Sequence, residues 1–307
     1  MKTVLLAAAF LAALSVSPAD ARPRPKAKPV ADAPVASPTP VYKDGPPDTT
    51  YEVPHKPYRI ADGLYYVGTQ GIGVYMIETH DGLIVLDSGT EKGVDLVEAN
   101  IQALGFKLSD VHILLETHAH WDHVGGMAKL KRDTGATFVA SAGDRYGLEN
   151  GVHVGENHYG GGTFPAVSVD RVINDGDKVK LGGVTMTAHL TPGHTRGDTT
   201  WTMDVKDHGV KHTVVFYGST TVAGNVLVGN NAYPNIVADY HLAFTHLKAI
   251  KADILLGNHP EFADQEAKYQ AQLAGKTDAF VDPKALPNLV KQSEADFGVA
   301  LAKEQTK

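Results

Sequence analysis

The chain has 307 residues, of which 43% are hydrophobic, and its 28 basic and 35 acidic side chains leave a formal net charge of −7. This is enough apolar sequence to bury a full core, whereas the acidic balance argues against a nucleic-acid partner, which would require a basic face. The sequence contains no cysteine, which excludes disulfides, thiolate metal ligands and a cysteine nucleophile.

The first 50 residues have the composition of a targeting segment followed by a tether. Residues 1–21 begin with Lys2, continue through a mostly apolar run at 4–16 and end in Ala-Asp-Ala, a pattern typical of a secretory signal peptide. The alternative, a membrane anchor, would need about 20 apolar residues to span a bilayer. We therefore expect a secreted protein without a membrane anchor, in the periplasm of a bacterium. Residues 22–50 are rich in Pro, Ala and Lys and predict a flexible tether.

Residues 51–307 are expected to form one α/β domain. Apolar runs and alternation predict the first strands, and 3.6-residue periodicity predicts the first helices. The expected strands cover 63–67, 73–78, 83–86, 111–115 and 137–140, and the expected helices cover 94–104 and 127–133. Residues 145–165 are rich in Gly, Asn and His without periodicity, which predicts a loop beside a functional site.

The second half of the domain shows a similar order of elements. Strands are expected at 184–190, 199–205, 213–217 and 253–256, and helices at 236–247 and from about 282 or 287 onward. The strands 199–205 and 213–217 are expected to form a hairpin. A run of strands, a helix and a further strand thus occurs twice, which favours two similar layers packed face to face.

The densest group of metal-binding residue types is Thr-His-Ala-His-Trp-Asp-His-Val-Gly-Gly at 117–126, directly after the strand 111–115. Imidazole and carboxylate donors at this density fit zinc. His118 and His120 are two residues apart, so on an extended segment they project to the same side and can share one ion. His194, which follows a strand and a Pro-Gly turn, is the best third ligand and leaves a fourth position open for water.

Asp122 and His123 cannot easily reach the ion held by the first histidines, so the sequence predicts a second zinc ion. His259, at the end of the last strand, would complete its protein ligands. Two Zn²⁺ ions per chain suggest a hydrolase, because zinc lowers the pKa of water from 15.7 towards roughly 7. For His194 and His259 the alternative is a capping or core histidine.

The remaining histidines have less support as functional residues. His112 and His189 lie inside predicted strands and are interpreted as packed residues or as partners that orient the metal ligands. His153 and His158 lie in the predicted loop, where contact with a substrate is the less favoured alternative.

These motifs resemble those of the metallo-β-lactamase superfamily. The matching pieces are the motif at 117–126, Thr-Pro-Gly-His at 191–194, the strand end Gly218-Ser219 and Gly-Asn-His-Pro at 257–260. They occur in the family's order across residues 51–307. The resemblance implies a four-layer αββα sandwich with a dinuclear zinc site at the edge where two sheets meet.

The strand end at Ser219 distinguishes activities within the superfamily. The resemblance implies a metal-bridging Asp in a Gly-Asp-Thr sequence for its thioesterases and lactonases, whereas this chain has Gly218-Ser219-Thr220. Two β-lactamase subclasses use a Cys ligand, so the chain resembles subclass B3, whose second zinc takes one Asp and two His. By this resemblance Asp122 and Ser219 are catalytic and Thr221 contacts the substrate carboxylate. Trp121 departs from the resemblance, because it is bulkier than many residues at that place, and it is expected to narrow or wall the site.

The sequence therefore predicts a zinc-dependent β-lactamase that hydrolyses penicillins, cephalosporins and carbapenems and confers antibiotic resistance. A secreted zinc lactonase or thioesterase of the same superfamily is the alternative enzyme. A zinc-binding protein without catalysis is the alternative of another class. A monomer is expected. Arg196 and Asp198 depart from the residues usual beside His194 in subclass B3, so the expected contacts there differ.

Overall fold

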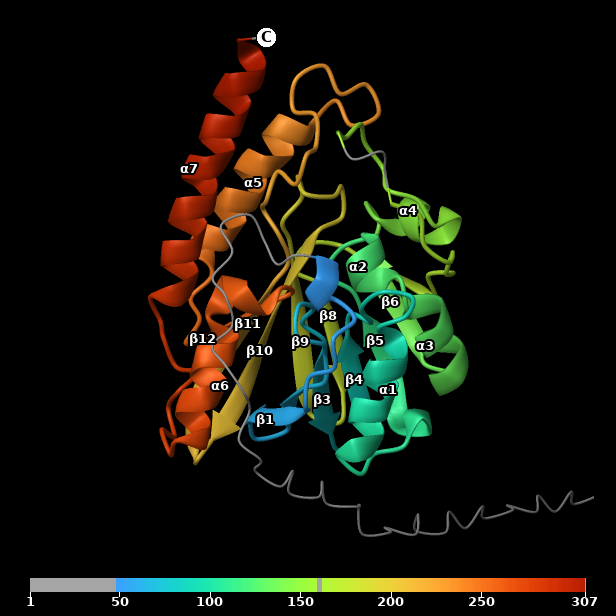
Figure 1. Ribbon diagram of the computed structural model, residues 1–307, viewed down its shortest axis with the longest axis vertical. Helices are drawn as coiled ribbons and strands as arrows, with labels where there is room; N and C mark the ends of the chain where they lie inside the picture. Colours follow the sequence, from blue (N-terminus) through green and yellow to red (C-terminus); the bar gives the residue numbers. More distant parts are fainter. Residues whose placement is uncertain (1–47, 159–161, 307) are drawn as a thin grey trace, which may run out of the picture.

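The computed structural model describes residues 48–158 and 162–306 (Figure 1). The expected signal peptide at 1–21 and the tether up to residue 47 lie outside the described residues. The last three tether residues, Asp48–Thr50, form a short 3-10 helix. Within the described part of the chain, no helix combines the length and the apolar composition needed to cross a membrane.

The first sheet has seven strands that lie side by side in chain order. Its first four strands pair antiparallel, and the fourth to seventh pair parallel. The strands are β1 (Tyr58–Ala61), β2 (Leu64–Tyr66), β3 (Tyr75–Thr79), β4 (Gly82–Leu86), β5 (Val111–Leu115), β6 (Thr137–Ser141) and β7 (Arg171–Ile173). The sequence predicted β2 to β6 but not β1 or β7, in which Arg59 and Arg171 leave only short apolar runs.

The second sheet has five strands in the order β12-β11-β10-β9-β8. Neighbouring strands pair antiparallel except β11 and β12, which are parallel. The strands are β8 (Lys178–Leu181), β9 (Val184–Leu190), β10 (Thr199–Asp207), β11 (Val210–Tyr217) and β12 (Ile254–Gly257). The expected hairpin is the pair β10 and β11, while β8 was not predicted.

Helices cover the outer faces of both sheets (Figure 1). The α-helices are α1 (Val94–Ala103), α2 (Trp121–Val124), α3 (Met127–Thr134), α4 (Arg145–Asn150), α5 (Ile236–Ala249), α6 (Gln265–Leu273) and α7 (Ala285–Gln305), with short 3-10 helices at Leu108–Asp110 and Pro260–Ala263. The prediction of an unbroken loop over 145–165 was wrong at its start, where α4 forms. This helix has six residues and ends at Gly151, which adopts the left-handed conformation with φ of 66°, so it is too short to show helical periodicity.

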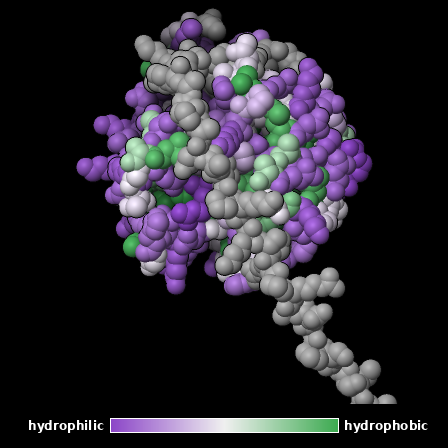
Figure 2. Space-filling view, turned by 60° about the horizontal axis from the view of Figure 1, so that its bottom comes forward, coloured by the Kyte–Doolittle hydropathy of each residue, from purple (hydrophilic) through white to green (hydrophobic). Residues whose placement is uncertain are grey.

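Three apolar clusters hold four layers together. The first joins α1 and α3 to the first sheet, with Val97 and Leu114 among its members. The second lies between the two sheets and contains Trp201 and Phe216. The third joins the second sheet to α5 and α7, with Phe244 among its members. The fold is therefore the αββα sandwich that the resemblance implied. On the face shown in Figure 2, hydrophilic residues predominate and hydrophobic ones form small groups.

Truncation of Phe216 tests the importance of the cluster between the sheets. Phe216 is 1% exposed, and its ring lies 5.3 Å from that of Tyr75 in the facing sheet. We expect Phe216→Ala to lower the free energy of unfolding by about 3–5 kcal/mol, because it removes apolar contacts and leaves a cavity. Urea denaturation measures this change. Val210→Ala, at the exposed end of the same strand, is the control and should change stability by less than about 0.5 kcal/mol.

Candidate metal centre

The six predicted ligands come from strand ends that meet at one edge of the sandwich. His118 and His120 follow β5, and the next two ligands lie in α2. His194 follows β9, and His259 directly follows Asn258 after β12. Because the second core cluster stacks the two sheets, strand ends from both sheets converge there.

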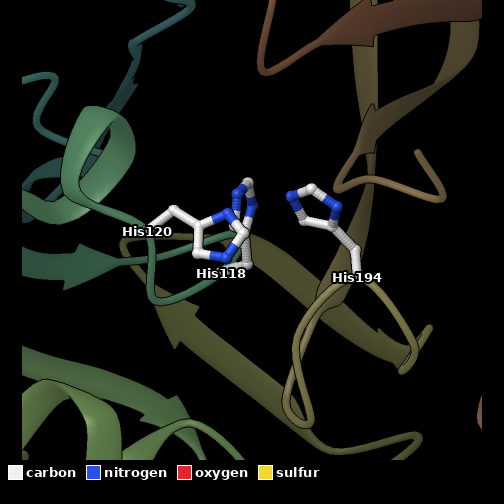
Figure 3. Close-up of side chains that lie close together, drawn as sticks. All are labelled: His118, His120 and His194. Carbon is white, nitrogen blue, oxygen red and sulfur yellow. The ribbon is translucent and has the colours of Figure 1, made fainter. Parts of the chain in front are cut away.

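The first group consists of His118, His120 and His194. Each offers a ligand atom, and these atoms lie within 4.8 Å of one another. All three residues are buried, and their rings gather around a common centre in Figure 3. The ring centroid of His194 lies 4.5 Å from those of both His118 and His120. The structure thus brings together the three histidines that the sequence assigned to one ion.

One ring nitrogen of His118 has hydrogen-bonding neighbours, and the other has none among the described residues. Its Nδ1 lies 3.2 Å from the hydroxyl of Thr117, which donates to Asp87. The carboxylate of Asp198 lies 3.7 Å from the same Nδ1. The Nε2 atom is buried and has no hydrogen-bond partner among the described residues. An imidazole nitrogen buried in this way is costly without a partner, and a metal ion would supply one.

The other two rings of the first group also have hydrogen-bond partners on the side that faces away from the other ligands. His194 Nδ1 lies 2.7 Å from the carbonyl oxygen of Thr221, to which it donates, so its Nε2 remains for a ligand. His120 Nε2 lies 2.7 Å from Nδ1 of His153. The nitrogen of His120 that remains is therefore Nδ1. Each of the three rings thus keeps one nitrogen for a shared ion.

The second group consists of Asp122, His123 and His259. His123 Nε2 lies 3.2 Å from His259 Nε2 and 3.3 Å from Asp122 Oδ2, and His259 Nε2 lies 3.6 Å from the same oxygen. The outer nitrogen of His259 donates to the carbonyl oxygen of Gly71 at 3.0 Å. The outer nitrogen of His123 lies 3.7 Å from Asp87 Oδ2. Three donor atoms therefore converge, as they do in the first group.

Burial keeps most of these imidazoles neutral, which is the form that binds metal. It lowers the pKa of His118 and His120 well below the ordinary value, and the neighbouring histidines add to this effect. Burial also lowers the pKa of His194 to about 3 and that of His259 to about 4. At neutral pH no proton therefore has to leave these four rings before they coordinate a metal.

His123 behaves differently because it is paired with carboxylates. Burial alone would lower its pKa, but the charges and hydrogen bonds of Asp122 and Asp87 outweigh burial and raise the pKa to about 10. Burial would likewise raise the pKa of Asp122, but His123 lowers it well below its ordinary value. Without metal, this pair is therefore a protonated imidazole beside a carboxylate.

The two groups fit divalent metal ions. Two imidazole nitrogens 3.2 Å apart in the second group, next to a carboxylate oxygen, are placed as ligands of one ion. Three nitrogens in one group and two nitrogens with one oxygen in the other are donor types that zinc accepts. Each group has three protein ligands, so each leaves room for water or substrate.

A buried carboxylate, Asp144, joins the loops that carry the first group. Its oxygens accept hydrogen bonds from the backbone N–H of Ala119 at 2.9 Å, the hydroxyl of Thr195 at 2.8 Å and the backbone N–H of Gly197 at 2.9 Å. Ala119 lies between two ligands, and Thr195 follows His194. No local sequence pattern marks Asp144, because its partners lie up to 53 residues away.

The predicted contact residues lie around the two groups. Ser219 is 2% exposed, and its hydroxyl lies 3.1 Å from that of Thr221, which in turn lies 3.2 Å from His194 Nδ1. Trp121 is half-buried, and its ring lies 5.8 Å from that of Tyr51. The ring of Tyr51 lies 5.6 Å from that of His259, so these aromatic side chains flank the second group. Substrate contact by Ser219, Thr221 and Trp121 stays a prediction.

The structure also shows the surroundings of the other histidines and polar residues that the sequence singled out. The interpretation of His112 as packed or as an orienting partner was wrong, because His112 is exposed on β5. His189 hydrogen-bonds to Thr202 at 2.9 Å, which agrees with the packing alternative. Arg196 is exposed, and its guanidinium lies 5.1 Å from the centre of the Tyr233 ring. Asp198 is fully buried, where Thr191 donates to it at 2.7 Å, and burial raises its pKa.

The αββα sandwich with two adjacent groups of metal-binding side chains at its edge defines a class of metal-dependent hydrolases. The family model described as the metallo-beta-lactamase superfamily matches residues 68–259. The chain therefore belongs to the metallo-β-lactamase superfamily.

Solved structures of subclass B3 enzymes resemble the chain over nearly their whole length. BJP-1, a subclass B3 metallo-β-lactamase of Bradyrhizobium japonicum, is 43% identical with a TM-score of 0.80, and the match covers 84% of this chain and 97% of that one. The native FEZ-1 metallo-β-lactamase of Legionella gormanii is 40% identical with a TM-score of 0.79, and the match covers 83% and 99% of the two chains.

A curated relative has another activity. The hydroxyacylglutathione hydrolase of Methylococcus capsulatus is 33% identical over 115 residues, which are 36% of this chain and 37% of that protein. The chain thus spans little more than a third of the length of this relative.

The pairing of His123 with Asp122 predicts proton release when metal binds. In the metal-free protein the raised pKa of His123 keeps this ring protonated below about pH 10, and a ligand nitrogen must be deprotonated. We expect zinc to displace about one proton per chain from the second group and none from the first. The measurement is an indicator titration at about pH 6, where water beside zinc keeps its own proton.

His123→Gln is the control for this measurement. It removes the titrating ring, so the release should fall close to zero while the first group still binds zinc. An equal release from the variant and the unaltered protein would contradict the assignment of the proton to His123.

Proposed function

We propose that the protein is a zinc β-lactamase of subclass B3, with two Zn²⁺ ions per chain, which hydrolyses penicillins, cephalosporins and carbapenems. The observation that carries this proposal is the match to BJP-1 across 97% of that chain at 43% identity. The convergence of the six predicted ligands in two groups supports it. So does the strand end at Ser219, where the superfamily resemblance gives thioesterases a metal-bridging Asp.

The proposed roles follow from the positions of the side chains. His118, His120 and His194 would hold one zinc ion, and the group containing Asp122 would hold the other. Zinc bound there supplies Lewis acidity that polarises the β-lactam carbonyl and makes water nucleophilic at neutral pH. The surrounding burial limits access of bulk water and so strengthens these charge interactions.

We assign the hydroxyl groups beside His194 to binding rather than to covalent catalysis. The Ser219 hydroxyl lies 3.1 Å from the hydroxyl of Thr221 and accepts a hydrogen bond from the backbone N–H of Thr221 at 3.2 Å, and neither group is a general base. A serine needs such a base to become a nucleophile, so no acyl-enzyme is expected. We assign Ser219 to orienting the attacking water and Thr221 to hydrogen-bonding the substrate carboxylate.

Secretion to a bacterial periplasm is part of this proposal. It rests on the signal-like sequence at 1–21. A periplasmic β-lactamase would meet β-lactams before they reach their targets, which is how the protein would confer antibiotic resistance. A monomer remains the expected state.

Hydrolysis of a chromogenic cephalosporin tests the proposal. The purified protein should hydrolyse it, a chelator should abolish turnover, and added zinc should restore it. His194→Ala should lower kcat/KM by more than about 100-fold, because losing a ligand should exceed the roughly 10–100-fold effect of losing an outer partner. His112→Ala, which removes an exposed histidine from β5, should leave kcat/KM unchanged. Turnover that is absent or independent of zinc would refute the proposal.

A thioesterase is the second candidate, and the hydroxyacylglutathione hydrolase relative favours it. Values of kcat/KM for a carbapenem, a glutathione thioester and a lactone separate the candidates. We expect the carbapenem value to be higher by at least about 100-fold, equivalent to about 2.7 kcal/mol of transition-state stabilisation. A higher value for the thioester or the lactone would assign the protein to the alternative activity.

A further inference from the structure

His153 contacts the outer face of a ligand in the first group. Its Nδ1 lies 2.7 Å from Nε2 of His120, and the two ring centroids are 4.8 Å apart. The outer nitrogens of the other two rings face oxygen atoms, a hydroxyl of Thr117 for His118 and a carbonyl for His194. Within the first group, His120 is therefore the ligand whose outer partner is another imidazole.

The short distance between the two nitrogens requires that one of them carries a proton. Two facing imidazole nitrogens form a hydrogen bond when one carries the proton and the other accepts it. If His120 keeps Nδ1 for the metal, its Nε2 carries the proton and donates to His153. An acceptor at this position thus selects the tautomer of His120 that can bind the ion, and it also restrains rotation of the ring.

Backbone hydrogen bonds hold His153 in place. The segment 152–158 is joined to the segment 222–233 by a bond from Val226 N–H to the carbonyl of Glu156 at 2.9 Å, and by one from His158 N–H to the carbonyl of Gly224 at 2.8 Å. A further isolated bridge pairs the backbones of the two segments.

Asn225 connects the same two segments to another ligand of the first group. Its side chain is buried and donates to the carbonyl oxygen of His194 at 2.9 Å. The paired segments therefore act on two of the three first-group ligands, His120 through His153 and His194 through Asn225.

We propose that His153 is a positioning residue for the first metal site, which fixes the ring orientation and tautomer of His120 by accepting its Nε2 proton. The inference rests on the proposed function for the presence of zinc, but not on the identity of the substrate. It predicts an effect on metal affinity that can be measured without any hydrolysis assay.

Zinc affinity in matched variants tests this role. His153→Phe keeps a ring of similar size but removes the acceptor, whereas His153→Gln keeps an acceptor oxygen. His158→Phe is the control, because it changes an exposed histidine of the same segment. Competition with a chromophoric chelator gives both zinc dissociation constants, and circular dichroism reports folding. His153→Ala provides a second acceptor-free variant if His153→Phe does not fold.

We expect the acceptor-free variants to raise the dissociation constant of the first site by about 10–100-fold, the range seen when an outer partner of a metal ligand is lost. His153→Gln should recover most of this loss, and His158→Phe should bind zinc as the unaltered protein does. The second site should be unaffected in all variants. Substitution with cobalt, followed by absorption spectroscopy, should show a changed spectrum at the first site in the acceptor-free variants.

Several results would overturn the inference. Unchanged first-site affinity in the acceptor-free variants would remove any role for His153, and His153→Gln binding as weakly as His153→Phe would exclude the hydrogen bond as the cause. Failure of the unaltered protein to bind zinc would overturn the inference together with the metal centre. The expected affinities without β-lactam hydrolysis would support the inference and refute the proposed function.

Discussion

Five imidazoles and one carboxylate are largely buried at a single edge of the sandwich, and the surrounding hydrogen bonds and packing serve to hold them there. A buried polar group without a partner costs about 1–3 kcal/mol, so every ring needs a partner for both nitrogens. The protein supplies partners or nearby carboxylates on the outer side of the rings, from oxygen atoms of Thr117, Thr221, Gly71 and Asp87 and from the ring of His153. On the inner side, the remaining donors face one another in two groups, and a metal ion in each group would satisfy them.

The two sheets bring these donors together. The apolar cluster between the sheets contains Leu115, Trp201 and Leu256, which lie on or next to the strands that lead to ligands. The indole N–H of Trp201 also donates to the backbone carbonyl of Glu116 at 2.9 Å, two residues before His118. Packing of the core and placement of the ligands are thus parts of the same arrangement, and a shift of one sheet against the other would separate the first group.

Much of this arrangement could be predicted from the sequence, and the reasons are local. The strands β5, β9 and β12 were predictable because they are continuous or alternating apolar runs, and α1 and α5 because their apolar residues repeat with helical spacing. The ligands were predictable because His118, His120, Asp122 and His123 lie within six residues, and the other two follow strands. The grouping into an αββα sandwich came from the family resemblance.

The features that were missed depend on contacts between distant segments. The elements β1, β7, β8 and α4 have three to six residues each, and each contains charged residues, so no apolar run or helical period marks them. His153 approaches His120 across 33 residues of sequence, and Asp144 approaches Gly197 across 53. No local pattern marks such residues, because their role exists only when the chain is folded.

Each of the two groups is expected to hold one metal ion. Anomalous X-ray diffraction at the zinc absorption edge, from crystals of the zinc-loaded protein, tests this most directly. We expect two anomalous peaks, one among His118, His120 and His194 and the other among Asp122, His123 and His259. A single peak, no peak, or a peak bound by other residues would contradict this expectation.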